Sequence, residues 1–323
     1  MQVRKTVLLL LSLLLSAFLL EAALRGYFRV RPSYDIEMWK YATHLKEPVN
    51  DPRGHIHVSG RSMRLMGVDV SINSKGLRDR EFAYSKPAGV FRILALGDSF
   101  TMGWGVPVED TFSKRIEKIL DRTSKVEVLN GGVGNYNTLQ ELTAYELEYS
   151  KYDPDLVLLC FYVNDAEPAQ ENKAPRFFPN SYLLAFLNRQ WQNVQLLLNP
   201  KTRFDAYYNA QFEGDSWSKY EEVIARLAQS VQARHSKLVV ALLPDFRMLD
   251  HYPFTNIHAK VKARFESLGV QVIDLAENLE SSFDRRPSSR YWVAWDDPHP
   301  NADAHRIIAE KIADRLVKEG LIR

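Results

Sequence analysis

The stretch Arg92–Val106, "RILALGDSFTMGWGV", takes the chain from a continuous apolar run directly into Gly97, Asp98 and Ser99. Continuous apolar runs are typical of parallel strands that are covered on both faces. In open sheets of such strands, ligands bind at the carboxyl ends of the strands. Ser99 therefore lies where a nucleophile is expected, although a lone serine at such a turn is more often a helix cap. Residues elsewhere in the chain decide between these two roles.

Apolar runs separated by helical patterns extend along the rest of the chain. One helix is expected after Pro107, and the last helix is expected to begin after Asn301 as its cap. This alternation predicts an α/β fold, a doubly wound three-layer sandwich around a mainly five-stranded parallel sheet. The five expected strands are 91–97, 126–130, 156–162, 238–243 and 270–274.

The composition is that of a globular protein with a substantial core. The chain has 323 residues, of which 46% are hydrophobic and 25% charged, and its net charge is +2. No basic stripe with interleaved aromatic residues is present, so we expect no nucleic-acid partner. The single Cys160 lies in an apolar run, which predicts a small core residue, and it excludes a disulfide within the chain.

The amino terminus, 1–30, has the pattern of a signal anchor or a signal peptide. Arg4 and Lys5 precede an apolar run over 7–24 whose one carboxylate is Glu21. The run is close to the shortest length that spans a bilayer, and no clear cleavage site follows it. We therefore favour an uncleaved anchor that makes the membrane a partner, with a cleaved signal peptide as the alternative. Basic residues on both sides of the run leave the orientation open.

Two segments fall outside the alternation of strands and helices. Residues 31–90 are rich in turns and predict an accessory lead-in to the main domain, 91–323. Residues 166–235 are longer than one crossover needs and predict an insertion of two helices, which is either a lid or extra bracing. Trp191 and Trp217 in this insertion suggest sugar contacts, or alternatively core positions.

His299 is the histidine best placed to act as a base. It lies in "WDDPHPN", in the loop before the last helix, and Pro298 and Pro300 stiffen the chain around it. Asp296, three residues earlier, is expected to hold the imidazole Nδ1–H and to leave Nε2 free to accept a proton. The alternative is that the acidic residues and Asn301 only form a turn and a helix cap.

Two further loops follow predicted strands and offer hydrogen-bond donors for an oxyanion. The loop "LNGGVGNYNT" contains glycines that let backbone N–H groups face a site, and "FYVND" carries the side-chain amide of Asn164. Each fragment alone is common. Together with Ser99 and His299, at the carboxyl ends of the strands, they predict one site.

These four blocks resemble those of the SGNH hydrolases, the GDSL-type serine esterase superfamily, over roughly residues 70–320. The lead-in "INSKGLRDREF" is similar to that of bacterial members that are membrane-anchored or exported. The resemblance implies that Ser99 is the nucleophile, His299 the general base and Asp296 its orienting partner. It also implies an oxyanion hole built from Asn164 and from backbone amides.

The second and third blocks depart from the family pattern. The resemblance implies backbone donors from Ser99 and from the 134–135 turn, where Asn135 replaces the usual glycine and Gly134 is the alternative donor. Asparagine tolerates a positive φ better than most residues, so the donor can be retained. Tyr162 stands two residues before Asn164, where the family usually has glycine, and its ring is expected to affect substrate size.

The function expected from these residues is hydrolysis of an O-acyl ester through a Ser-His-Asp triad and an acyl-enzyme, with no cofactor and no metal. The expected substrate is an acylated small molecule or a glycan, and the catalytic domain is expected outside the cytoplasm. One alternative is an O-acyltransferase acting on a surface polysaccharide. A second is a non-catalytic carbohydrate-binding or assembly protein. The sequence identifies no protein partner.

Overall fold

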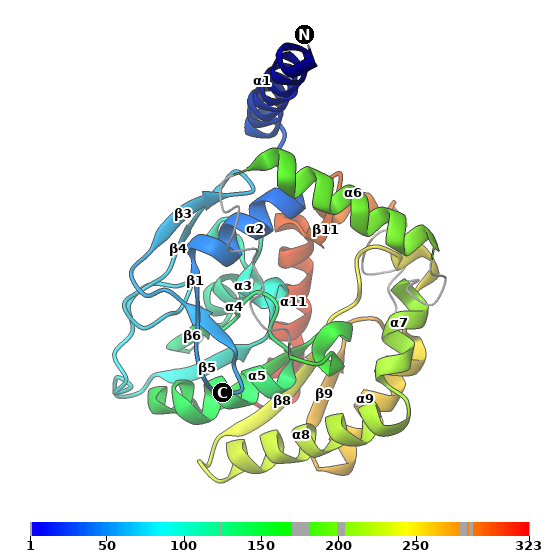
Figure 1. The fold of residues 1–323 in the computed structure, drawn as a ribbon. Helices are drawn as coiled ribbons and strands as arrows, with labels where there is room; N and C mark the ends of the chain where they lie inside the picture. Colours follow the sequence, from blue (N-terminus) through cyan, green and yellow to red (C-terminus); the bar gives the residue numbers. More distant parts are fainter. Residues whose placement is uncertain are drawn as a thin grey trace.

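The computed structural model describes residues 2–122, 124–169, 181–198, 204–277, 283 and 287–322. A five-stranded parallel sheet forms the centre of the molecule, with the strand order β6-β5-β7-β8-β9 (Figure 1). Its strands are β5 (Phe91–Leu96), β6 (Val126–Asn130), β7 (Leu156–Phe161), β8 (Lys237–Leu242) and β9 (Gln271–Asp274). The predicted doubly wound α/β fold is confirmed, and each strand lies within a residue or two of its predicted bounds.

Helices cover both faces of this sheet. α4 and α11 pack against each other on one face, whereas α5 and α8 pack together on the other. This arrangement follows from right-handed crossovers on both sides of β5, which is the first strand of the sheet in the sequence. The helices of the sandwich are α3 (Ser99–Met102), α4 (Phe112–Leu120), α5 (Thr138–Leu147), α8 (Gly214–Gln232), α9 (Thr255–Ser267) and α11 (Ala302–Lys318).

Local sequence signals fix the ends of several helices. The Asn301 side chain accepts hydrogen bonds from the N–H groups of Asp303 and Ala304, and this confirms the predicted cap of α11. Thr111 caps α4 in the same way, and Asn137 forms a capping box at the start of α5. The central strand β7 is buried along its whole length, and Cys160 within it is a buried free cysteine, as predicted.

The segment between β7 and β8 contains three described helices, where the sequence predicted two. These are α6 (Tyr182–Leu198), α7 (Phe204–Gln211) and α8. The helix that was not predicted is α7, which lies in the stretch expected as a loop between the other two. Parts of the predicted insertion, 170–180 and 199–203, lie outside the described residues.

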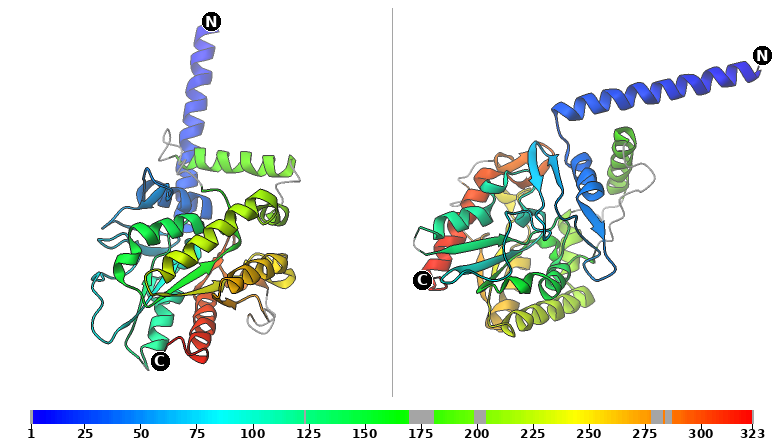
Figure 2. Two further views of the ribbon diagram at one scale, coloured as in Figure 1. Left: turned by 90° about the horizontal axis from the view of Figure 1, so that it is seen from below. Right: turned by 90° about the vertical axis from the view of Figure 1, so that its left-hand side faces the viewer.

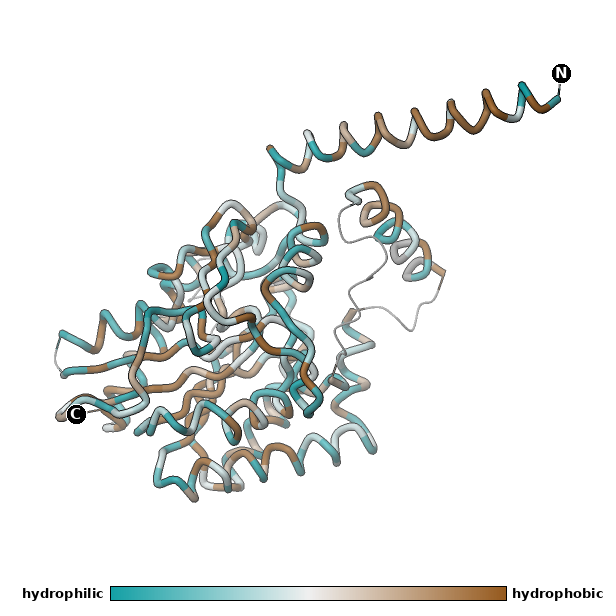
Figure 3. The backbone as a smooth tube through the Cα atoms, turned by 60° about the vertical axis from the view of Figure 1, so that its left-hand side comes forward, coloured by the Kyte–Doolittle hydropathy of each residue, from teal (hydrophilic) through white to brown (hydrophobic). Residues whose placement is uncertain are grey.

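The chain before the sheet forms a long helix and a small layer of strands. α1 (Gln2–Val30) is long and apolar enough to cross a membrane, and it projects from the body without burying a residue (Figures 2 and 3). After it come α2 (Tyr34–His44) and two antiparallel pairs, which lie against the carboxyl ends of β5 and β6. The pairs are β1 (Lys46–Pro48) with β2 (His55–His57), and β3 (Ser62–Leu65) with β4 (Val68–Ser71).

Candidate active site

Ser99 is the first residue of α3, directly beyond the carboxyl end of β5. The helix cap is Asp98, whose side chain accepts a hydrogen bond from the N–H of Phe100, so Ser99 does not serve as the cap. Gly97 is required here, because a Cβ on it would lie 2.0 Å from Thr101 Oγ1. The turn therefore presents the Ser99 hydroxyl at the edge where β5 has β6 on one side and β7 on the other.

His299 reaches Ser99 from the other end of the chain. It lies in the short strand β11 (Asp297–Pro300), which pairs with β10 (Trp292–Ala294) just before α11. Its Nε2 lies 2.8 Å from Ser99 Oγ, and its Nδ1 lies 2.6 Å from Asp297 Oδ1. The side chains of His299 and Asp297 are both buried. Hydroxyl, imidazole and carboxylate thus form one continuous hydrogen-bonded chain, which is the geometry that activates a serine.

The expectation that Asp296 orients His299 is corrected by this geometry. Asp297 takes that place, and its Oδ1 also accepts the backbone N–H of His299 at 3.1 Å. The reason is the extended backbone of β11: residues two apart in a strand point to the same side, whereas Asp296 lies before the strand begins. In an irregular loop, which is what the sequence predicts for this segment, the spacing of three between Asp296 and His299 would be suitable instead.

Asp297 is held ionised although it is fully buried. Burial by itself would raise the pKa of its carboxyl group, but the charge of His299 and the hydrogen bonds from His299 and Trp104 lower that pKa. The indole Nε1–H of Trp104 donates to Asp297 Oδ2 at 2.7 Å, so both carboxylate oxygens have donors. The sequence analysis missed Trp104, although it lies in the opening stretch.

Asn164 lies beside the serine turn, in the single helical turn η3 (Val163–Ala166) that follows β7. One hydrogen of its side-chain amide is donated to Asp98 Oδ2 at 2.9 Å. A primary amide has two hydrogens, so the second remains available for an oxyanion. The Ser99 N–H belongs to the first turn of α3, where backbone donors have no partner within the helix.

The second donor loop, 131–135, lies directly against the serine turn. The N–H of Val133 donates to the Gly97 carbonyl at 3.0 Å, and a Cβ on Gly132 would lie 2.1 Å from the Met102 nitrogen. Asn135 has a φ of 67°, as expected for a residue in the place of a glycine. Its N–H has no hydrogen-bond partner within the described residues.

The alternative donor, Gly134, is corrected by the structure. Its N–H donates to the hydroxyl of Tyr41 at 2.9 Å and is therefore occupied. Tyr41 belongs to α2, and its ring packs so closely on Gly134 that a Cβ there would lie 2.7 Å from the ring. Of the two residues of the turn, only Asn135 keeps a backbone N–H that can serve a substrate.

Residues of the lead-in hold this turn, which the sequence analysis did not foresee. Lys46 Nζ donates to Asn135 Oδ1 at 2.9 Å and to the Gly134 carbonyl at 2.5 Å, and His55 Nε2 lies 3.2 Å from the same carbonyl. Burial lowers the pKa of Lys46 to about 7, against a smaller opposing effect of Asp98. A neutral amine still has two hydrogens, which is the number that these two acceptors need.

Aromatic rings cover the histidine. The Tyr34 ring of α2 lies 5.4 Å from the His299 ring, and the Phe100 ring lies 5.2 Å from it. The Tyr162 ring packs 4.3 Å from Phe100 and donates its hydroxyl hydrogen to Asp245. Ser99 and His299 are each 6% exposed as a result.

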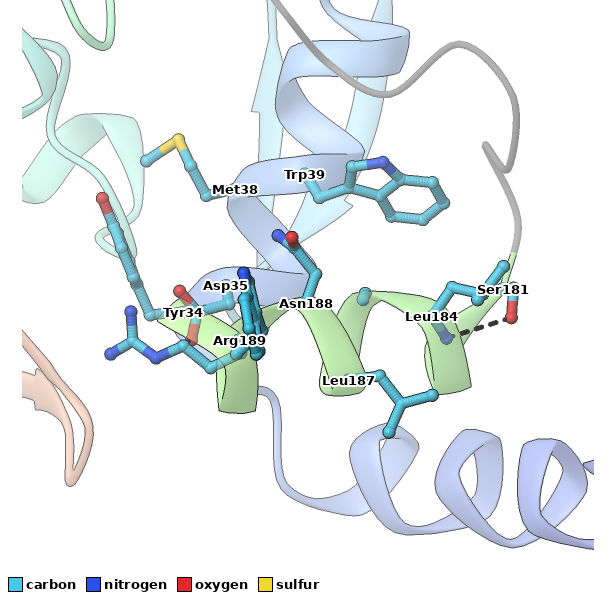
Figure 4. Close-up of a pocket in the computed structure, with 11 residues that line it drawn as sticks. Tyr34, Asp35, Met38, Trp39, Ser181, Leu184, Leu187, Asn188 and Arg189 are labelled. Carbon is cyan, nitrogen blue, oxygen red and sulfur yellow. Dashed lines mark hydrogen bonds and ion pairs between the residues drawn. The ribbon is translucent and has the colours of Figure 1, made fainter. Parts of the chain in front are cut away.

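A pocket of about 590 Å³ lies between α2 and α6, and Tyr34 forms part of its wall (Figure 4). Trp191 lines it from α6, and Arg189 pairs with Asp35 across it at 3.2 Å. Trp217 does not line this pocket and packs against Phe212 and Tyr220 beside the core. Of the two tryptophans of the insertion, Trp217 is therefore the one that packs against the core, where it is partly buried.

Comparisons with known proteins agree with this architecture. Residues 95–307 match the GDSL-like Lipase/Acylhydrolase family. No curated protein matches the chain. Among solved structures, a two-domain esterase active on acetylated mannans is similar, with 15% identity and a TM-score of 0.47. The match covers 71% of this chain and 49% of the esterase, so this chain spans about half the length of that protein.

Two further solved structures have a similar course of the chain. An acetyl xylan esterase has 17% identity and a TM-score of 0.47, with 70% of this chain and 100% of that one covered. A catalytic mutant of an acetylxylan esterase from Geobacillus stearothermophilus has 14% identity and a TM-score of 0.46, with 71% and 94% covered. The family match covers well over half of the sequence, and the chain belongs to the GDSL-like lipase/acylhydrolase family of serine ester hydrolases.

Proposed function

We propose that this esterase uses Ser99 as its nucleophile, His299 as general base and Asp297 as the residue that orients the imidazole. The observation that carries the proposal is the hydrogen-bonded chain from Ser99 Oγ to His299 Nε2 at 2.8 Å and from His299 Nδ1 to Asp297 at 2.6 Å. A core serine or a helix cap would need neither contact. Binding alone would not need a base aimed at a hydroxyl, which argues against a non-catalytic carbohydrate-binding or assembly protein.

The proposed reaction is acyl transfer to Ser99 followed by hydrolysis. Ser99 Oγ bonds to the ester carbonyl carbon while His299 takes the hydroxyl proton, and the oxyanion is met by the N–H groups of Ser99 and Asn135 and by Asn164. The bond to the alkoxy oxygen then breaks, and His299 protonates the departing alcohol. Water attacks the acyl-enzyme by the same steps, which releases the acid and restores Ser99. The scheme uses no cofactor and no metal.

The proposed substrate carries a short acyl group on a glycan or a small molecule. The rings of Phe100 and Tyr34 close around His299 and support a small acyl group such as acetyl. Several solved proteins with a similar course of the chain act on acetylated polysaccharides, so acetylated glycans are the first natural esters to test. Tyr162 supports the same restriction by packing against Phe100.

The proposed organisation is a signal anchor over 1–30, a lead-in over 31–90 and a catalytic domain over 91–323. The catalytic domain lies outside the cytoplasm. The length and apolarity of α1 support the anchor, since none of its residues is buried. A cleaved signal peptide would have the same composition. Extraction of the full chain from cell membranes with alkaline carbonate separates these alternatives, because only an anchored chain stays in the pellet.

One observation favours an O-acyltransferase as the second candidate. Ser99 and His299 are nearly shielded from solvent by Tyr34 and Phe100. Restricting the access of water slows hydrolysis of an acyl-enzyme and leaves time for a sugar hydroxyl to accept the acyl group. The catalytic residues would be the same in both cases.

The test is hydrolysis of p-nitrophenyl acetate by the full chain in mild detergent, with Ser99→Ala beside Ser218→Ala as the matched control. Ser218 is an exposed residue of α8, so its variant should keep the wild-type rate. Loss of hydrolysis only in Ser99→Ala supports the proposal, whereas wild-type turnover in that variant rejects Ser99 as the nucleophile. Acetylation of Ser99 without release, followed by transfer to an added oligosaccharide, would favour the acyltransferase.

A further inference from the structure

α6 carries a stripe of apolar side chains that the described part of the molecule does not cover. Positions on a helix advance by about 100° per residue, so residues spaced by three and four lie on one face. Trp191 is 62% exposed and Leu198 78% exposed, and these are high values for such large apolar residues. The stripe consists of Leu184, Leu187, Trp191, Val194 and Leu198.

The other side of α6 is tied to the body. Arg189 lies two positions after Leu187, which places it nearly opposite the stripe, and it pairs with Asp35 of α2 at 3.2 Å. Figure 4 shows Leu187 pointing from α6 toward the side where α1 lies. The apolar stripe is therefore turned away from the sheet domain.

The start of α6 is fixed to the apolar helix α1. Glu21 accepts hydrogen bonds from the N–H groups of Tyr182 and Leu183 at 3.0 and 2.8 Å, and from Ser181 Oγ at 3.0 Å. A carboxylate at the first turn of a helix satisfies donors that have no partner in the helix. Glu21, the one carboxylate in the apolar run of α1, therefore caps the start of α6. This contact fixes the position along α1 at which α6 begins.

The direction of α6 suits a surface perpendicular to α1. α6 crosses α1 at the level of Glu21 and lies on the side of the body from which α1 projects (Figure 2). A bilayer spanned by the apolar run 7–24 would have its surface near the end of that run, within about one helical turn of Glu21. The stripe of α6 would then lie at the boundary between headgroups and acyl chains, where tryptophan is favoured.

Basic side chains gather at the same level. A second pocket, of about 480 Å³, lies between the end of α1 and the β3–β4 pair, and its basic lining residues are Arg25, Arg29, Lys40 and Arg64. Cations in this position favour the anionic headgroups of a bilayer. Three of the four also pair with carboxylates of the chain: Arg25 with Glu21, Lys40 with Glu37 and Arg64 with Asp69.

We infer that α6 lies in the surface of a lipid bilayer, with the stripe Leu184–Leu198 inserted beside the membrane-spanning α1. This inference rests on the membrane span that we propose for α1. It has a consequence for the pocket between α2 and α6, because Leu184, Leu187 and Trp191 border both the pocket and the stripe. The pocket next to Tyr34 then opens at the membrane surface and not into bulk water.

The test uses nitroxide labels on the full chain, reconstituted in vesicles of phosphatidylcholine and phosphatidylglycerol. Single cysteines are introduced at Leu187, Trp191, Leu14 in α1 and Glu222 in α8, in a background in which the buried Cys160 is replaced by alanine. Collision with apolar oxygen is compared with collision with a water-soluble nickel complex. Turnover of p-nitrophenyl acetate shows that each labelled chain is folded.

The expected result is a ratio of oxygen to nickel collision several times higher at Leu187 and Trp191 than at Glu222, and below that at Leu14, which lies deeper in the bilayer. An aqueous ratio at Leu187 and Trp191 with a membrane ratio at Leu14 would overturn the inference while the anchor stands. An aqueous ratio at Leu14 would overturn the anchor, and the inference with it. Low collision with both reagents on α6 would mean that a protein covers the stripe, and this also overturns the inference.

Discussion

The two sides of the candidate active site are built by different parts of the chain. On one side, Ser99, His299 and Asp297 come from the ends of the sheet domain and contact each other directly. On the other side, the 134–135 turn is held by Tyr41 and Lys46 of the lead-in. The sheet alone brings the nucleophile to its base, whereas the oxyanion side depends on a segment that precedes the sheet. Substitutions on the two sides should therefore differ in size and in kind.

The largest effect is expected from Asp297→Asn, with Asp296→Asn as its matched control. Replacing the carboxylate that orients the histidine removes the acceptor for Nδ1–H, and such changes lower kcat by about 10⁴. Among the described residues, Asp296 has no hydrogen bond or ion pair with His299, so its variant should stay within a few fold of wild type. The rates on p-nitrophenyl acetate measure both effects, and a larger loss in the Asp296 variant would restore the assignment made from the sequence.

A loss of about 10²–10³ in kcat is expected for Asn164→Ala, because one oxyanion donor is removed. The control is Asn256→Ala, which removes the same group from an exposed position on α9. Steady-state kinetics with p-nitrophenyl acetate should show the loss in kcat with little change in KM. A kcat near wild type would exclude Asn164 from the oxyanion hole.

A smaller effect, about tenfold in kcat, is expected for Lys46→Met. The variant loses the hydrogen bond to Asn135 Oδ1, whereas the Gly134 carbonyl keeps His55 Nε2 at 3.2 Å, and a bond of this kind contributes about 1–1.5 kcal/mol. Lys40→Met is the control, since Lys40 pairs with Glu37 on the same segment and does not contact the turn. Equal activity in the two variants would show that the lead-in does not act on the oxyanion side.

The smallest effect on activity at neutral pH is expected from a change in the protonation state of Lys46. That change should appear instead in the pH dependence of the free energy of unfolding. Burial lowers its pKa to about 7, so between pH 7 and the ordinary pKa of 10.5 the unfolded chain binds more protons than the folded one. The free energy of unfolding should rise with pH over this range, by at most about 1.4 kcal/mol per unit.

Urea unfolding of the wild type and Lys46→Met across this range measures that rise, which should be smaller in the variant. Below about pH 7 this contribution to the slope disappears, because Lys46 is protonated in both the folded and the unfolded chain. An identical slope in the two proteins would mean that Lys46 titrates normally in the folded state.

The sequence predicted the sheet because its buried strands are continuous apolar runs, a signal that does not depend on distant contacts. It also indicated Ser99, His299 and Asn164, since each follows directly from a strand end or a rigid loop. The choice between Asp296 and Asp297 depended on the backbone conformation of the β10–β11 pair. These strands have three and four residues, which is too short for an alternating sequence pattern to predict them.

The contacts between the lead-in and the sheet domain were not predictable. Lys46 and Asn135 are 89 positions apart, and neither has a local pattern that points to the other. Trp104 was missed for a similar reason, because its partner Asp297 is 193 positions away. The apolar stripe of α6 was visible as apolar residues, but a buried helix face would have the same spacing, and only the exposure of Trp191 separates the two.

The central claim is that Ser99 is the residue that becomes acylated, and covalent labelling tests it most directly. The full chain in detergent is treated with a fluorophosphonate, digested, and mapped by mass spectrometry. The account predicts a single adduct on Ser99, which forms much more slowly in His299→Gln and stays near the wild-type rate in Asp296→Asn. An adduct on another residue, together with unchanged turnover of p-nitrophenyl acetate in Ser99→Ala, would contradict it.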